Sequence, residues 1–252
     1  MEIAEKRGGH NRKKFHEEFF KQWSPSMAYV LGYAFADGTL IESQVARCCY
    51  LRFVSNDKSL LQQVKLVLGS EVKIQKRGVR KLISHNKIYW SKPSYVLSIG
   101  NKVLFQQLVQ LGLKPDKSLD MQFPYVPQEY LSFFIRGYFD GDGCVSITNQ
   151  GKRLQVAFTS GSKEFLTTLS QHLANISFVK KQNVVKSTRS YQLRFSTHEA
   201  MQVLAFMYEK LELALYLKRK YKIYQQWRDT QVVKGPVCKT VIRGFDSRSR
   251  LK

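Results

Sequence analysis

The chain has 252 residues, of which 43% are hydrophobic, and its 41 Lys and Arg against 19 Asp and Glu give a formal net charge of +22 at pH 7. This hydrophobic share is ordinary for a globular fold, and the absence of a long apolar run or an apolar signal core argues against a transmembrane helix or a secretory leader. So large a positive excess indicates a polyanionic partner, nucleic acid ahead of a membrane, with a solvated basic surface as the plainer alternative.

The cysteines show neither CxxC spacing nor the Cys/His spacing of a metal site. Reduced thiols in an intracellular protein are therefore expected, and bacterial cytoplasm and an organelle both remain open. The four residues are Cys48, Cys49, Cys144 and Cys238.

In chain order, residues 1–23 form a basic extension expected to fray or to lie on a surface. Ser24-Pro25 then caps a helix that runs to about Ala36, and Gly38 is placed to end it in a left-handed conformation. The pattern next predicts strands at 39–43 and 47–55, a helix at 57–68, strands at 71–76 and 94–100, and a helix at 102–111. Between the last two strands lies a long basic connection, residues 77–87.

A linker, residues 112–126, leads to the same order again. Helices are predicted at 127–141, 163–173, 199–209 and 211–228, with strands at 144–149, 152–160, 177–182 and 189–196. Residues 229–252 form a basic tail. The predicted fold is therefore α+β, with half-domains 24–111 and 127–228, each built on an antiparallel sheet.

The strongest pattern is an internal repeat. Residues 30–38 read VLGYAFADG and residues 135–143 read IRGYFDGDG. Gly32 matches Gly137 and Asp37 matches Asp142, each pair 105 residues apart, and the same offset continues into the strand that follows. A repeat of this length predicts two similar subdomains related by a pseudo-twofold axis.

Each motif helix carries a small residue every four positions, and these residues are Gly32, Ala36, Gly137 and Gly141. Small side chains let two helix backbones approach closely, so the two helices are predicted to pack together and to bring Asp37 and Asp142 side by side. Carboxylates and the free carbonyls of helix ends suit a hard cation such as Mg²⁺, and two such ions can promote attack on a phosphodiester. Asp140, matched by Phe35, is predicted to be a helix-end or packing residue.

These segments resemble the paired motifs of the LAGLIDADG homing endonucleases, in the single-chain form with two motif copies. Residues 134–143 are the closer copy, whereas the first departs from the family pattern at Phe35. The resemblance covers residues 24–228 and implies αββαββα half-domains whose sheets form a DNA-binding saddle. It further implies a monomer that cleaves double-stranded DNA at a long, non-palindromic target and leaves short 3′ overhangs.

For the site, the resemblance implies that Asp37 and Asp142 hold Mg²⁺, assisted by the carbonyls of Ala36 and Gly141. Mn²⁺ is expected to substitute, and Ca²⁺ to support binding without cleavage. A lysine of each half is expected near the metal-bound water, and Lys117 and Lys218 are the candidates. Val54 and Thr159 occupy strand positions that often carry a polar residue near that water, so the two half-sites are expected to differ in efficiency.

Alternation along the strands predicts which side chains face DNA, because Leu51, Phe53, Val156 and Phe158 point to the core. Side chains on the opposite face or in the basic connection are candidates for base or phosphate contacts. The candidates are Tyr50, Arg52, Lys73, Gln75, Arg77, Arg80, Arg153, Gln155, Thr159, Lys180, Gln192 and Arg194.

Two other functions remain open. One is an intron RNA-binding maturase on the same fold, and the other is a non-cleaving DNA-binding regulator, against which the retention of both acids argues. An intein is not expected, because the chain begins at Met1 and no His-Asn pair ends it.

Overall fold

A computed structural model describes residues 14–43, 48–84, 87–115, 120–148, 150, 152–176 and 179–233. The first half begins with helix α1 (Pro25–Asp37), followed by strands β1 (Gly38–Ser43) and β2 (Cys48–Ser55) and helix α2 (Lys58–Val67). Strands β3 (Gln75–Arg77) and β6 (Ser94–Gly100) and helix α3 (Lys102–Gln110) complete it. A separate hairpin, β4 (Lys81–Ser84) and β5 (Lys87–Trp90), lies between β3 and β6 in the chain.

The second half repeats this order. A short 3₁₀ turn (Gln128–Tyr130) leads into helix α4 (Leu131–Asp142), then strands β7 (Gly143–Thr148) and β8 (Arg153–Ser160) and helix α5 (Lys163–Ile176). Strands β9 (Val185–Lys186) and β10 (Tyr191–Ser196) and helix α6 (Thr197–Tyr208) follow. A second 3₁₀ turn (Leu211–Leu213) precedes helix α7 (Lys218–Val233). The predicted α+β fold with two αββαββα halves is confirmed.

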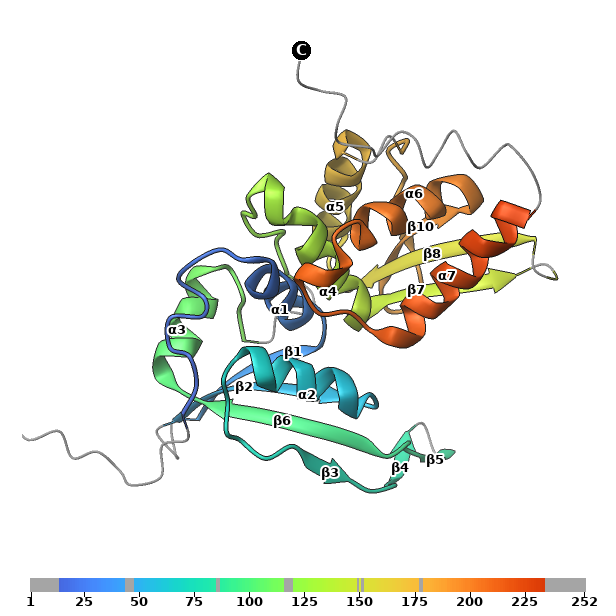
Figure 1. Cartoon of the computed structure of the whole chain (residues 1–252). Coiled ribbons are helices and arrows are strands. Elements are labelled where there is room, and N and C mark those ends of the chain that lie inside the picture. The colour runs from blue at the N-terminus through green and yellow to red at the C-terminus, as the bar shows by residue number, and fades with distance from the viewer. Residues whose placement is uncertain are drawn as a thin grey trace, which may run out of the picture.

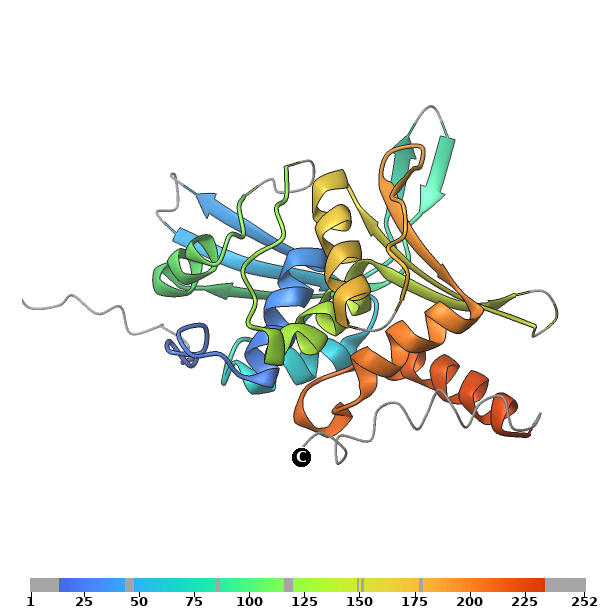
Figure 2. The ribbon, with the colours of Figure 1, turned by 90° about the horizontal axis from the view of Figure 1, so that it is seen from above.

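The two four-stranded sheets share one topology. Their strand orders are β1-β2-β6-β3 and β7-β8-β10-β9, with antiparallel pairing throughout. Leu51 and Phe53 on β2 are buried, as are Val156 and Phe158 on β8, so the predicted core face of each sheet is confirmed. Helices α1 and α4 lie between the two sheets, which places the repeat axis at the centre of the molecule (Figures 1 and 2).

Helices α1 and α4 pack backbone against backbone. A Cβ atom added at Gly32 would lie 2.0 Å from the carbonyl oxygen of Phe134, and one added at Gly137 would lie 2.0 Å from the carbonyl oxygen of Tyr29. No side chain larger than hydrogen fits at such distances. Gly32 and Gly137 therefore set the approach of the two halves.

Several local predictions were wrong. Gly38 is extended, with φ −77° and ψ 142°, because the chain enters β1 directly; a Cβ there would lie 2.6 Å from the Ala34 carbonyl oxygen, so close approach explains this glycine. The strand predicted at 71–76 shrinks to β3. Of the strand predicted at 177–182, the described residues 179–182 form no strand, and the two-residue β9 follows them. The helix predicted from Leu211 breaks before Lys218.

The basic connection predicted at 77–87 overlaps a hairpin formed by β4 and β5. β4 and β5 pair antiparallel and form a two-stranded sheet of their own beyond the ends of β3 and β6 (Figure 1). Large apolar side chains on it are exposed, among them Ile83, Ile88 and Trp90. The alternation that predicts amphipathic strands could not reveal a hairpin with both faces in solvent.

The described part of the N-terminal extension packs on the body of the protein. Phe20 is buried, Trp23 stacks on Tyr130 with ring centroids 6.0 Å apart, and the His16 amide donates to the Leu68 carbonyl at 2.9 Å. Of the two alternatives expected for this extension, residues 14–23 therefore show the segment that lies on the protein surface and not the frayed one. Within the described ranges, no helix is long and apolar enough to span a bilayer.

Candidate active site

The acid-bearing ends of α1 and α4 meet at the centre of the molecule. A Cβ added at Gly141 would lie 2.3 Å from the Ala36 Cβ and 3.3 Å from the Asp37 Cγ. α1 ends at Asp37 and α4 ends at Asp142, so the two carboxylates belong to abutting helix ends. A hollow of about 420 Å³ lies beside Asp37, and Gly141, Val54, Asp57 and Arg219 also contribute to its walls.

In each half, a buried tyrosine lies near the motif acid. Burial, followed by the charge of Asp37, raises the pKa of Tyr33, and burial followed by the charge of Asp142 raises the pKa of Tyr138. The Tyr138 hydroxyl donates to the Thr159 carbonyl at 2.7 Å. Both phenols therefore stay neutral near the acids, and the repeat extends from the motif to its buried neighbours.

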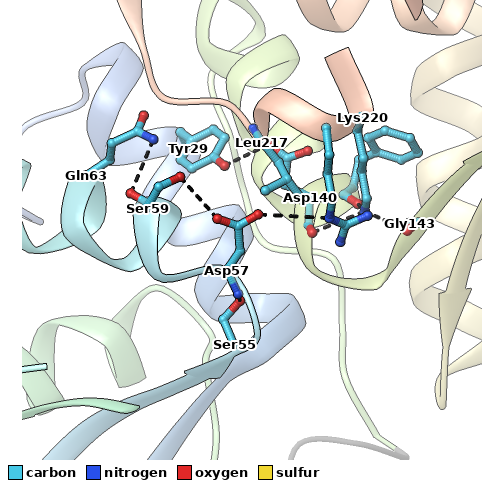
Figure 3. Close-up of polar contacts among 11 residues, drawn as sticks. Tyr29, Ser55, Asp57, Ser59, Gln63, Asp140, Gly143, Leu217 and Lys220 are labelled. Carbon is cyan, nitrogen blue, oxygen red and sulfur yellow. Dashed lines mark hydrogen bonds and ion pairs between the residues drawn. The ribbon is translucent and has the colours of Figure 1, made fainter. Parts of the chain in front are cut away.

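Asp140 connects three parts of the chain. Its Oδ2 accepts hydrogen bonds from the Tyr29 hydroxyl on α1 and from the Leu217 amide just before α7, both at 2.7 Å (Figure 3). Asp140 is 3% exposed and therefore a buried carboxylate. Asp140 is the first of the two acids in the second motif copy. It links the two halves at a point that also borders the hollow.

Lys220 caps the end of α4. Its Nζ donates to the carbonyl of Phe139, to that of Asp140 at 3.1 Å and to that of Gly143 at 2.6 Å (Figure 3). A cation at a helix C-terminus satisfies its free carbonyls and its partial negative charge. Burial lowers the pKa of Lys220 to about 8, and the charge of Asp140 opposes this.

The structure thus places Lys220, and not the candidate Lys218, against the motif helix, since Lys218 is exposed. Lys117, the other candidate lysine, lies outside the described residues. Sequence reasoning missed Lys220, although α7 carried a signal for it. Leu217, Tyr224 and Trp227 share one buried helix face, and position 220 falls on that same face.

The buried carboxyl group of Asp140 predicts a specific pH dependence of the protein's stability. Burial raises the pKa of Asp140 from its ordinary 3.8 to about 6, although Lys220, Tyr29 and Arg136 oppose the rise. Folded Asp140 therefore holds its proton more tightly than unfolded Asp140, and its contribution to stability is greatest below pH 4 and is lost as the pH rises through 6. Asp140→Asn keeps an acceptor oxygen and abolishes this titration.

Between pH 4 and 7, we expect the free energy of unfolding of wild type to fall relative to that of Asp140→Asn by on the order of 2–3 kcal/mol. Urea denaturation of both proteins across this range measures the difference. Asp229→Asn, the same change at an exposed position of α7, should show no such trend. A constant difference between wild type and Asp140→Asn would contradict the assignment.

The donor set fits a hard divalent cation. Asp37, Asp142 and the carbonyls of Ala36 and Gly141 supply only oxygen, which Mg²⁺ and Ca²⁺ prefer. Within the described ranges, no group of three or more His, Cys, Asp and Glu side chains could hold a metal by itself. An ion held by the two acids would have the carbonyls of Ala36 and Gly141, water or a phosphate oxygen as further ligands.

The predicted DNA contacts fall into two groups. Most occupy the strands of the two sheets or, in the case of Arg80, the entrance to the β4–β5 hairpin; these are Tyr50, Arg52, Gln75, Arg77, Arg153, Gln155, Thr159, Gln192 and Arg194. Lys73 and Lys180 lie outside the strands on which they were predicted. Lys73 instead borders a hollow beside α2 together with Lys58 and Lys65.

Some of these side chains are already organised by the sheet. Arg52 donates to Ser98 at 3.0 Å, Arg153 to Ser196 at 3.1 Å, and Arg194 to Gln192 at 2.9 Å. A neighbouring strand thus holds the guanidinium groups of Arg52 and Arg153, and Gln192 of the same strand holds that of Arg194. An arginine held in this way loses less side-chain entropy when it binds a base or a phosphate.

Comparison with known proteins identifies the fold. Residues 129–226 match the model of the LAGLIDADG-like domain. The meganuclease I-CpaMI, solved bound to uncleaved DNA, superposes with a TM-score of 0.53 at 11% identity, covering 88% of this chain and 97% of the other. The chain has the LAGLIDADG homing endonuclease fold. I-WcaI, solved bound to its DNA recognition sequence, shares the fold with a TM-score of 0.51 at 13% identity, covering 82% and 91% of the two chains.

Sequence relatives share a segment with this chain. A probable translation initiation factor IF-2 of Thermococcus kodakarensis is 30% identical over 169 residues, which is 64% of this chain and 12% of that protein. The ribonucleoside-diphosphate reductase NrdEB subunit alpha of Bacillus subtilis is 27% identical over 161 residues, which is 60% of this chain and 14% of that protein. This LAGLIDADG-fold chain therefore spans only a small part of these relatives.

Proposed function

We propose that this protein is a site-specific double-strand DNA endonuclease with half-domains 24–111 and 127–228. The observation that carries the proposal is the pair of acids, Asp37 and Asp142, at abutting helix ends between two sheets of like topology. A protein that only binds DNA has no need for two carboxylates facing phosphates, since they repel the polyanion. The net charge of +22 supports a nucleic-acid partner.

In this proposal, Asp37 and Asp142 hold Mg²⁺ with help from the carbonyls of Ala36 and Gly141. When bound there, Mg²⁺ would supply a lower pKa for an attacking water and positive charge at the scissile phosphates. The chain itself positions these ligands, because the glycine contact fixes the spacing of the helix ends. Lys220 offsets the partial negative charge of the α4 terminus, which would otherwise repel a phosphate.

The first test is cleavage of a random DNA library, with Mg²⁺ and with EDTA in parallel. Metal-dependent double-strand cuts within one long site support the proposal and map its half-sites. Because the halves differ in sequence, the selected site is expected to be non-palindromic. Binding without cutting in Mg²⁺ would contradict the endonuclease and favour a regulator or an RNA-binding maturase, for which intron RNA is the next ligand to test.

The two kinds of basic side chain are expected to behave differently. Arg194→Ala, on β10, should relax base preference at one position of the target by about 1–3 kcal/mol, because a bidentate contact to a base edge is lost. Arg80→Ala, at the hairpin entrance, should weaken binding to all sequences alike and reduce the salt slope by about 1. Binding titrations against single-base variants at several salt concentrations separate these outcomes, and uniform weakening by Arg194→Ala would make it a phosphate contact.

A further inference from the structure

The pseudo-twofold symmetry is broken at one pair of residues beside the acids. Tyr29 corresponds to Phe134 and Asp140 corresponds to Phe35, each 105 residues apart. On one side of the pseudo-twofold axis, the Tyr29 hydroxyl donates to Asp140 at 2.7 Å. At the matching place on the other side, the rings of Phe35 and Phe134 meet edge to face with centroids 5.6 Å apart. A polar tie on one side of the axis is thus replaced by an aromatic contact on the other.

The polar tie leads directly to one acid. Asp140 accepts the Leu217 amide at 2.7 Å, which fixes the point where the chain turns into α7. Three residues later, Lys220 reaches the carbonyls of Phe139, Asp140 and Gly143, which surround Asp142 in the chain. Phe35 has no side-chain atom that can accept a hydrogen bond, so it cannot hold a chain segment in this manner.

The position of Asp140 makes this tie strong. It is buried among Tyr29, Arg136 and Tyr208, and its charge acts on all three. Arg136 is fully buried and lies with its guanidinium 5.9 Å from the centre of the Tyr29 ring. Hydrogen bonds to a buried charged group contribute more than neutral ones, and removing the acceptor strands both donors.

We propose that Asp140 is a positioning residue that acts more on the Asp142 half of the site than on the Asp37 half, so that the two strands of a DNA target are cut at unequal rates. Only the unequal cutting of the two strands rests on the proposed endonuclease function. The physical basis of the positioning role is the one-sided link from Asp140 through Leu217 and Lys220 to the end of α4.

Asp140→Ala removes the acceptor, Asp140→Asn retains an oxygen in its place, and Asp229→Ala is a control at an exposed position of α7. Hydrogen exchange of the protein without metal or DNA is the first measurement. Asp140→Ala should speed exchange by about tenfold or more at the Leu217 amide and at residues 141–143, and by a smaller factor at residues 36–38. Asp140→Asn and Asp229→Ala should stay close to wild type. If Asp140→Ala does not fold, Tyr29→Phe removes one donor and carries the same test.

Cleavage of a target with each strand labelled at its own end is the second measurement. Wild type should accumulate molecules nicked in one preferred strand, and Asp140→Ala should slow one strand's cut at least about tenfold more than the other, with rescue by Asp140→Asn. Equal slowing of both strands, or unchanged exchange at Leu217 and residues 141–143, would overturn the inference. Wild-type protein that cuts no DNA would overturn the proposed function, while the exchange result would still decide whether Asp140 positions the α4 end.

Discussion

Asp142→Asn is expected to abolish double-strand cleavage while leaving DNA binding within about twofold of wild type, and Asp37→Asn is expected to do the same. Each change replaces a carboxylate at the junction of α1 and α4 by a neutral amide, which lacks the negative charge that attracts a hard cation. Losing a ligand for the ion that stabilises the scissile phosphate removes several kcal/mol of transition-state stabilisation, or a rate loss of at least about a thousandfold. Strand-specific cleavage rates and binding titrations in Ca²⁺ measure the two effects separately.

The matched control is Asp120→Asn, the same chemical change at an exposed acid whose lysine partner, Lys114, lies 3.8 Å away on the surface. It should leave cleavage unchanged, because surface ion pairs contribute little. Undiminished cleavage by either motif variant would remove the metal role from that acid. A parallel loss of binding would instead assign the acid to folding or to the DNA interface.

The central part of this fold could be predicted because its sequence motif occurs in two copies. The 105-residue offset identifies both motif helices and both acids, and the small residues at 32 and 137 predict that the two helices pack together. Both inferences need only the pattern in the sequence. Leu51, Phe53, Val156 and Phe158 were assigned correctly because one face of each sheet is buried and strands alternate with period two.

What the sequence did not predict depends on tertiary contacts. Lys218, Arg219 and Lys220 are three adjacent cations, and only the docking of α7 decides that Lys220 is the buried one. Asp140 differs from its counterpart Phe35 in a way the repeat makes visible, yet its role follows from Leu217, which is 77 residues away. Residues 71–74 stay outside β3, and the Glu71 amide donates to the Lys14 carbonyl of the N-terminal segment at 3.2 Å.

Gly32→Ala and Gly137→Ala are expected to destabilise the protein strongly, although alanine is the better helix former by about 1 kcal/mol. The added methyl at position 32 would lie 2.0 Å from a backbone carbonyl oxygen of α4, and the one at 137 equally close to a carbonyl of α1. Backbone atoms in packed helices cannot move aside as a flexible side chain can, so the helices must separate along their whole contact. We expect a loss of about 3 kcal/mol or more in the free energy of unfolding and a fall of about 6–12 °C in melting temperature.

Gly78→Ala is the matched control, because a Cβ at Gly78 meets no atom within 4 Å and its φ lies outside the left-handed region. It should leave the melting temperature within about 2 °C of wild type, since only backbone entropy changes. Calorimetry of the three variants separates helix propensity from helix contact, because the two effects have opposite signs at positions 32 and 137. A stability gain at either position would mean that α1 and α4 do not pack this closely, and the shared site of Asp37 and Asp142 would then lose its geometric basis.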